Sequence, residues 1–149
     1  MKILVATDGS EYSRHAIEKC TYFVAPEGRT EIMIMSAAEN VTPIAAEPFG
    51  VSNQYYAEVS EDLRKQAVNA VEEAEKIIGE KCAGRDYAIV TEVYQGNVKE
   101  EIIEAAKRFG ADLIVVGSHG YGFLSRVLLG SVSDFVIHHA PCSVLVVRG

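Results

Sequence analysis

Hydrophobic residues follow two alternating patterns along the chain. Short β-branched runs predict strands, and longer segments with apolar residues three and four positions apart predict helices. The predicted strands are residues 2–7, 31–38, 87–94, 113–116 and 143–147, with helical segments between them. This alternation is typical of a parallel sheet with crossover helices. We therefore expect one α/β domain, residues 1–149, with an open, doubly wound, five-stranded parallel sheet and helices on both faces.

The predicted helices have recognisable starting points. Ser10 can cap the first helix and Asn97 the third, because their side chains accept hydrogen bonds from the free amides of a first turn. The longest helix is predicted at residues 55–78, and the last begins at Gly130-Ser131. The apolar face predicted for the first helix consists of Ala16, Ile17, Cys20, Phe23 and Val24.

Residues 39–54 form a long connection without a hydrophobic period. They include Pro43, Pro48 and Gly50, and a structureless connection of this length is uncommon inside a compact domain. Such segments are usually lids, partner-binding surfaces or disordered chain. Because residues 39–54 are expected near the ligand crevice, we favour the interpretation that they form a surface that a protein partner binds.

The composition excludes some classes of partner. There are 14 Lys and Arg against 21 Asp and Glu, a net charge of -7, which disfavours general binding to nucleic acid or anionic membranes. The longest aliphatic runs are far shorter than the roughly 20 residues that cross a bilayer, and the apolar run after Met1 is too short for a signal peptide. We therefore expect a cytoplasmic protein without membrane insertion. Cys20, Cys82 and Cys142 have no Cys-x-x-Cys spacing, which favours reduced, mostly buried thiols.

Polar residues and glycines follow the first and fourth predicted strands. The first strand ends in Thr7-Asp8-Gly9-Ser10, and a glycine cluster lies between the fourth strand and the last helix: Gly117, Gly120, Gly122 and Gly130. Ligands of doubly wound sheets bind at the carboxyl ends of the strands, and glycines let backbone amides approach an anion. With a helix start at Gly130-Ser131, this pattern predicts a phosphate site. The alternative is that the glycines only form turns and Ser131 is only an N-cap, and the pattern by itself leaves both open.

The spacing Gly117-x2-Gly120-x9-Gly130-Ser131 resembles the nucleotide-binding motif of the universal stress protein family. The resemblance covers essentially the whole chain and includes residues 6–10 (ATDGS), 117–120 (GSHG), 128–134 (LLGSVSD) and 140–148 (APCSVLVVR). Family members that carry the full glycine motif bind ATP. The resemblance therefore implies a Rossmann-like fold and ATP, with Mg²⁺, as the bound cofactor.

Carried over residue by residue, the resemblance assigns nucleotide contacts to this chain. Thr7 and Asp8 would lie beside the ribose, and Asp8 also near a phosphate-bound Mg²⁺. The main chain at Ser36 and Ala37 would contact adenine, although many relatives have a larger apolar residue there. Gly117, followed by Ser118 in the motif, would lie near the ribose. The phosphate contacts implied are the amides of Gly120, Gly130, Ser131 and Val132, with the Ser133 hydroxyl as a further donor.

Several other polar residues have simpler interpretations. His119 adjoins Ser118, but adjacency does not make a nucleophile and base, so we expect loop structure rather than catalysis. His138 and His139 point in different directions on a helix, which favours helix-end residues that interact with the dipole over a metal site. Arg126 either contacts a phosphate or lies in solvent.

The glycine loop lacks the lysine of a Walker-type phosphate loop and an obvious carboxylate to orient a water. We therefore expect a nucleotide-dependent stress-response or signalling module without catalytic residues, which hydrolyses ATP slowly at most. One alternative is an enzyme, either an ATPase or a relative of the pyrophosphatase-type adenylating enzymes, for which Asp8-Gly9-Ser10 is a thin match. Another is an interaction scaffold with an empty crevice, against which the intact motif argues.

The last predicted strand, residues 143–147, would be an exposed aliphatic edge if it lies outermost in the sheet. Unprotected edges of this kind invite pairing with another chain. This argument, together with the family resemblance, predicts an isologous homodimer through the last strand.

Overall fold

The computed structural model describes residues 1–39, 53–120 and 129–149. Its strands are β1 (Lys2–Ala6), β2 (Thr30–Ala38), β3 (Tyr87–Gln95), β4 (Leu113–Gly117) and β5 (Ser143–Val147). Its helices are α1 (Glu11–Cys20), α2 (Asn53–Lys81), α3 (Val98–Phe109) and α4 (Ser131–His139), with a short 3-10 helix, η1 (Thr21–Phe23), directly after α1. Each strand begins and ends within one residue of its predicted bounds.

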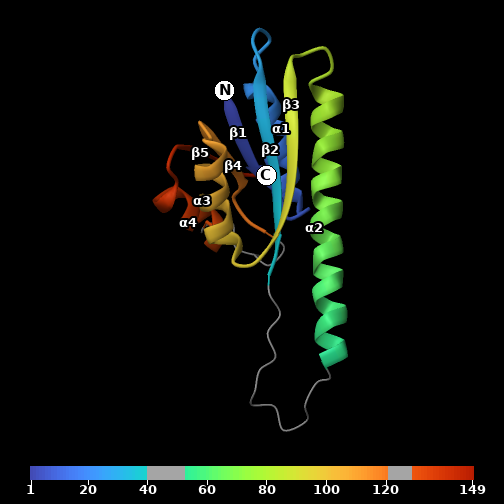
Figure 1. Ribbon diagram of the computed structural model, residues 1–149. Helices are drawn as coiled ribbons and strands as arrows, with labels where there is room; N and C mark the ends of the chain where they lie inside the picture. The colour runs from blue at the N-terminus through green and yellow to red at the C-terminus, as the bar shows by residue number, and fades with distance from the viewer. Residues whose placement is uncertain (40–52, 121–128) are drawn as a thin grey trace.

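The sheet is parallel throughout, with the strand order β3-β2-β1-β4-β5. The chain builds outward from β1 through β2 to β3, and then returns to the other side of β1 for β4 and β5 (Figure 1). The winding direction therefore reverses between β1 and β4, where doubly wound folds bind their ligands. The predicted fold class is confirmed.

Two hydrophobic cores lie on opposite faces of the sheet. Helices α1 and α2 cover one face, and α3 and α4 cover the other (Figure 1). Because successive strand residues point to opposite faces, β1 places Ile3 and Val5 in the first core and Leu4 in the second. β4 divides its residues in the same way and is buried from Leu113 to Val116, which explains its uninterrupted apolar run.

The first helix is shorter than its hydrophobic pattern predicts. α1 ends at Cys20, and the chain continues as η1. Ala16, Ile17 and Cys20 are buried as predicted, but Phe23 is 41% exposed, so its predicted place on the buried face is wrong. A 3-10 helix has about 3.0 residues per turn instead of 3.6. The apolar period of α1 therefore does not continue through η1.

Helix α2 is longer than predicted at both ends and has 29 residues. Its second half packs Val71, Ala74 and Ile78 into the core. Its first half extends beyond the sheet in Figure 1, and no residue from 54 to 66 is buried. The regularly spaced apolar residues of this helix are therefore buried only where the helix packs on the sheet.

Strands β3 and β5 form the two edges of the sheet. The last strand is therefore outermost, the condition on which its predicted pairing depends. The other edge strand, β3, does not alternate cleanly between apolar and polar residues, and it is partly open to solvent: Val90 is 47% exposed.

The cysteines are unpaired thiols, with Cys20 and Cys82 buried and Cys142 half-buried. Burial raises the pKa of the Cys20 thiol to about 12, and the neighbouring Cys82 contributes to this increase. Within the described ranges, no helix has the length and apolar character needed to span a membrane.

Candidate functional site

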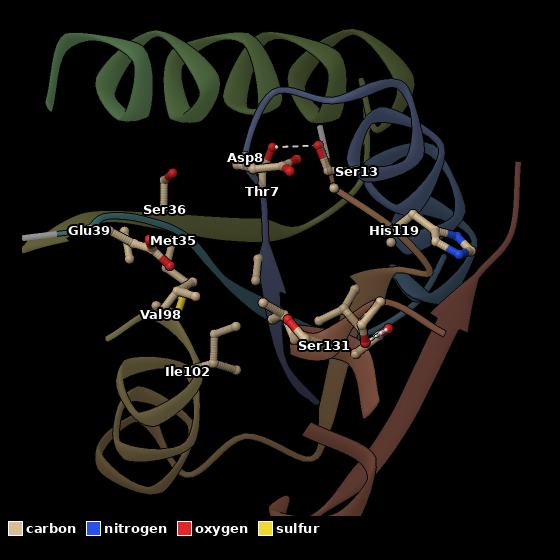
Figure 2. Close-up of a pocket in the computed structure, with 18 residues that line it drawn as sticks. Thr7, Asp8, Ser13, Met35, Ser36, Glu39, Val98, Ile102, His119 and Ser131 are labelled. Atoms are coloured by element: carbon tan, nitrogen blue, oxygen red, sulfur yellow. Dashed lines mark hydrogen bonds between the residues drawn. The ribbon is translucent and has the colours of Figure 1, made fainter. Parts of the chain in front are cut away.

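A cavity of about 570 Å³ lies at the carboxyl ends of β1, β2 and β4. The starts of α3 and α4 also line it. Figure 2 shows Met35, Val98 and Ile102 grouped at one end of the cavity and His119 at the opposite end. The cavity therefore occupies the crevice that the reversal of winding creates.

The cavity brings together every predicted nucleotide-site residue except Ser118. The predicted residues that line it are Thr7, Asp8, Ser36, Ala37, Gly117, Gly120, Gly130, Ser131, Val132 and Ser133. These residues come from four separate segments of the chain, at 7–8, 36–37, 117–120 and 130–133. Ser118 is buried beside the cavity and does not line it.

The turn from β1 into α1 is held by a network of hydroxyl groups. The Ser10 hydroxyl caps α1 by accepting a hydrogen bond from Ser13 N at 3.3 Å. The Thr7 hydroxyl donates to Ser13 Oγ at 3.1 Å and accepts from Gly9 N at 3.2 Å (Figure 2). Gly9 has a φ of 81°, a conformation that favours glycine. This network places Asp8 at the edge of the cavity.

Asp8 has both a structural and a potential binding role. Its Oδ1 accepts hydrogen bonds from Ser10 N at 3.0 Å and from Ser10 Oγ at 2.6 Å, which fixes the turn. Its other oxygen, Oδ2, lies against Gly120. The carboxylate is exposed and lines the cavity. The turn function and the predicted ligand function are therefore compatible.

Gly117 is required by the packing of α1 on β4. A Cβ at this position would lie 2.8 Å from Tyr12 C and 2.9 Å from Ser13 N. These are backbone atoms of α1, so a side chain would push the helix away from the strand. Gly117 also lines the cavity. The absence of a side chain therefore allows α1 to pack on β4 and also leaves room for a ligand.

The start of α4 is attached to the end of β4 through Gly130 and Ser118. Gly130 N donates to Ser118 O at 2.8 Å, and the Ser133 hydroxyl is hydrogen bonded to Ser118 O at 3.1 Å and to Gly130 O at 2.9 Å. A Cβ at Gly130 would lie 3.0 Å from Ser118 O. The Gly130 amide and the Ser133 hydroxyl proton, both predicted phosphate donors, are thus occupied within the protein in this structure.

Gly130, and not Ser131, is the N-cap of α4. Ser131 is the first helical residue, is exposed, and lines the cavity together with Val132. The first amides of a helix have no partner within the helix, and the positive end of the dipole favours anions there. The amides of Ser131 and Val132 are therefore suited to hold an anion, and the alternative that Ser131 is only an N-cap is wrong.

An apolar part of the cavity wall was not predicted from the sequence. Val98 and Ile102 come from the first turns of α3, and Met35 from the end of β2. The spacing of these residues along their helix and strand predicted that they lie in the core. No pattern in the sequence indicates that their side chains also reach the cavity. The other lining residues without a predicted binding role are Ala6, Ser13, Glu39, Val116 and His119.

The charges around the cavity are acidic in the described part of the chain. Asp8 and Glu39 line it, and no Lys or Arg among the described residues does. Residues 40–52 and 121–128, which include most of the predicted partner surface at 39–54, Gly122 and Arg126, lie outside the described residues. The predictions for them stay untested.

The histidines have structural contacts. His119 Nδ1 is 3.0 Å from Ser118 Oγ. In the last turn of α4, His138 Nδ1 and His139 Nδ1 each lie 2.8 Å from the carbonyl oxygen four residues earlier. These contacts agree with the helix-end interpretation of His138 and His139, and no group of three metal-ligating side chains is found in the described ranges.

Comparisons with known proteins agree with the fold. The model of the universal stress protein family matches residues 1–148. The universal stress protein YxiE of Bacillus subtilis is 32% identical over 150 residues, covering 99% of this chain and 98% of that protein. The solved structure of the hypothetical protein MJ0577 is similar with a TM-score of 0.81 and 28% identity, covering 99% of this chain and 95% of that chain. A universal stress protein solved in complex with cAMP has a TM-score of 0.65 and 25% identity, covering 99% of this chain and 96% of that chain. On this evidence, the chain belongs to the universal stress protein family.

Proposed function

We propose that this protein binds an adenine nucleotide, ATP together with Mg²⁺, in the cavity between β1 and β4, and acts as a nucleotide-dependent stress-response or signalling module. The observation that carries the proposal is one cavity with a polar end at the start of α4 and an apolar end at α3. Its volume of about 570 Å³ is in the range of small-molecule sites. A nucleotide has the same division into an anionic part and a flat, weakly polar base.

The phosphates would lie at the start of α4. The amides of Ser131 and Val132 are the donors that we assign to them, because the Gly130 amide already donates to Ser118 O. Gly120 and Gly130 also line the cavity. Backbone amides combined with a helix dipole are a common phosphate site in proteins.

The base would lie against Met35, Val98 and Ile102, with the main chain of Ser36 and Ala37 at its edge. Burial of a flat ring against these side chains favours binding, and backbone groups give adenine its hydrogen bonds. The ribose would lie between these two ends, near Thr7 and Gly117. The relative that was solved with cAMP supports an adenine nucleotide as the ligand class.

Asp8 is the residue to which we assign a role at the nucleotide-bound Mg²⁺. Its carboxylate is held by two hydrogen bonds from Ser10 and lies at the edge of the cavity. Oxygen ligands from one or two carboxylates together with phosphates are typical of Mg²⁺ sites. The ion would also reduce the repulsion between the phosphates and this acidic cavity.

Binding, rather than rapid hydrolysis, is the activity that the cavity favours. None of the described lining residues is a Lys or Arg that could stabilise the transferring phosphoryl group. Backbone amides that bind the ground state and the transition state equally well increase the affinity for ATP but do not accelerate its hydrolysis. A turnover of ATP above roughly 1 per second, within the ordinary enzyme range, would overturn this part of the proposal.

The nucleotide content of the purified protein tests the proposal. We expect denaturation to release an adenine nucleotide in near-stoichiometric amount, and the emptied protein to bind ATP and Mg²⁺ saturably. Gly130→Val should abolish this binding, because a side chain there meets the backbone at Ser118, and circular dichroism should confirm that the variant is folded. If neither bound nucleotide nor saturable binding is found, the scaffold alternative replaces the proposal.

We also propose that residues 1–149 form one domain that pairs through β5 as a homodimer. β5 is an edge strand with the aliphatic sequence SVLVV, and an unprotected edge favours pairing with a second copy. Analytical ultracentrifugation should give the mass of a dimer at micromolar concentration. A monomer under these conditions would contradict the pairing.

A further inference from the structure

A second cavity, of about 410 Å³, lies on the side of the Ser118–His119 segment away from most of the nucleotide cavity. It is formed by the first turns of α1, the residues after β4 and the residues after β5. Its lining includes Glu11, Tyr12, His15, His119 and Arg148. His119 is the residue that lines both cavities in the described part of the chain.

Hydrogen-bond donors predominate in this second cavity. The Arg148 guanidinium is a permanent cation with five donors, and the Tyr12 hydroxyl and the two imidazoles can also donate. The Tyr12 and His119 rings contact each other, with centroids 5.2 Å apart. In Figure 2 the His119 ring points away from the residues at the other end of the nucleotide cavity. Glu11 is the acidic side chain that opposes this donor set, and Gly149, the last residue of the chain, also lines the cavity.

His15 lines the second cavity and has one ring nitrogen without a hydrogen-bond partner. Its Nδ1 atom is buried and has no hydrogen-bond partner, and it lies beneath Gly149, whose Cβ position would be 3.0 Å from it. An unpaired buried polar atom is unfavourable. Because this atom is covered, a ligand in the cavity would contact the partly exposed remainder of the His15 imidazole.

We propose that this second cavity binds a small oxyanion, either inorganic phosphate or the phosphoryl group of a small molecule, with Arg148 as its main anchor. The planar guanidinium can bind two oxygens of a phosphate at once. The His15 and His119 imidazoles also line the cavity and can supply further donors. The site is separate from the proposed nucleotide site, and His119 links the two because it contacts both.

Titration with inorganic phosphate, followed by the imidazole NMR signals of His15, tests the proposal. His15 lines the second cavity and not the nucleotide cavity, so its signals report the correct site. We expect a saturable shift in the wild-type protein. Arg148→Gln should weaken phosphate binding about tenfold or more, the equivalent of losing one charge-assisted pair. Arg148→Lys should retain part of the affinity, and Glu11→Gln should strengthen it because a repelling charge is removed.

Arg29→Gln is the matched control. Arg29 is exposed and precedes β2 at the opposite end of the sheet, so its loss should leave the His15 response unchanged. Saturating ATP should also leave the response in place, because phosphate at the nucleotide site would instead be displaced. The absence of a saturable His15 shift, or equal phosphate affinities in Arg148→Gln and Glu11→Gln, would overturn the proposal whether or not ATP binds.

Discussion

The Oδ2 atom of Asp8 lies 2.7 Å from the point where a Cβ of residue 120 would be, so the Asp8 carboxylate fills the space that Gly120 leaves. The carboxylate has little freedom to move aside, because its Oδ1 accepts two hydrogen bonds from Ser10. Gly120 does not have a positive φ. The glycine is therefore required here by the close approach of Asp8 and not by backbone conformation.

Gly120→Ala should weaken the binding of ATP and Mg²⁺ about tenfold or more, because displacement of the Asp8 carboxylate would remove interactions of roughly 1.4 kcal/mol or more. In the Asp8→Ala background the same substitution should have a much smaller effect, because the oxygen that it displaces is gone. Isothermal titration calorimetry of the four proteins measures the coupling. Equal effects of Gly120→Ala in both backgrounds would show that Asp8 and Gly120 are not coupled as described.

Gly117→Ala should destabilise the fold itself. The new Cβ would lie within 2.9 Å of the backbone of Tyr12 and Ser13, and overpacking of this kind reduces the free energy of unfolding by about 1–3 kcal/mol. Denaturant unfolding measures the loss. Gly79→Ala is the control, because Gly79 is within α2 and its Cβ would meet only Tyr87 Oη at 3.9 Å. Similar stability of the two variants would contradict the packing role of Gly117.

Much of the fold follows from the sequence because β1, β2, β4 and β5 are largely apolar. The predicted bounds of β4 and β5 agree with the structure to within one residue, because the apolar residues of each strand end where the strand leaves the core. The order of the strands was not predicted, since pairing depends on contacts between distant segments. Phe23 was misplaced because a change from α-helix to 3-10 helix alters the direction of side chains without changing residue types.

The candidate site was predictable in its residues and less so in its hydrogen bonds. The motif identified the glycines, but the partner of the Gly130 amide is Ser118 O, and such a contact depends on how the end of β4 meets α4. The apolar wall was missed for a related reason. Val98 and Ile102 have ordinary core spacing, and only the packed structure shows that they also face the cavity.

Removal of divalent cations should weaken ATP binding more than AMP binding. The charged residues that line the described part of the cavity, Asp8 and Glu39, are acidic, and an ATP molecule without Mg²⁺ brings more negative charge to them than AMP does. With EDTA present, we expect the ATP affinity to decrease about tenfold or more. Glu39→Gln should reduce this difference. An ATP affinity that is unaffected by EDTA would contradict the role of Mg²⁺.

Stability should decrease at alkaline pH through Cys20. Burial raises the pKa of this thiol from about 9 to about 12, with Cys82 contributing. Between these values the folded protein retains a proton that the unfolded chain releases, so the free energy of unfolding falls as pH rises. Urea unfolding between pH 8 and 11 should show a steeper loss in the wild type than in Cys20→Ala. Parallel curves for the two proteins would argue against a buried, protonated Cys20.

The most direct test of the proposed nucleotide site removes one backbone donor at the start of α4. Ser131→Pro deletes the first amide of the helix but suits its position, because proline is favoured there and Gly130 before it is extended, with φ -64° and ψ 152°. Ser131→Ala is the control, since it removes the hydroxyl and keeps the amide. Calorimetric titration with ATP and Mg²⁺ should show a loss of affinity of about tenfold or more in Ser131→Pro and little change in Ser131→Ala. Affinity in Ser131→Pro equal to that of the wild type would contradict the claim that the amides of α4 hold the phosphates.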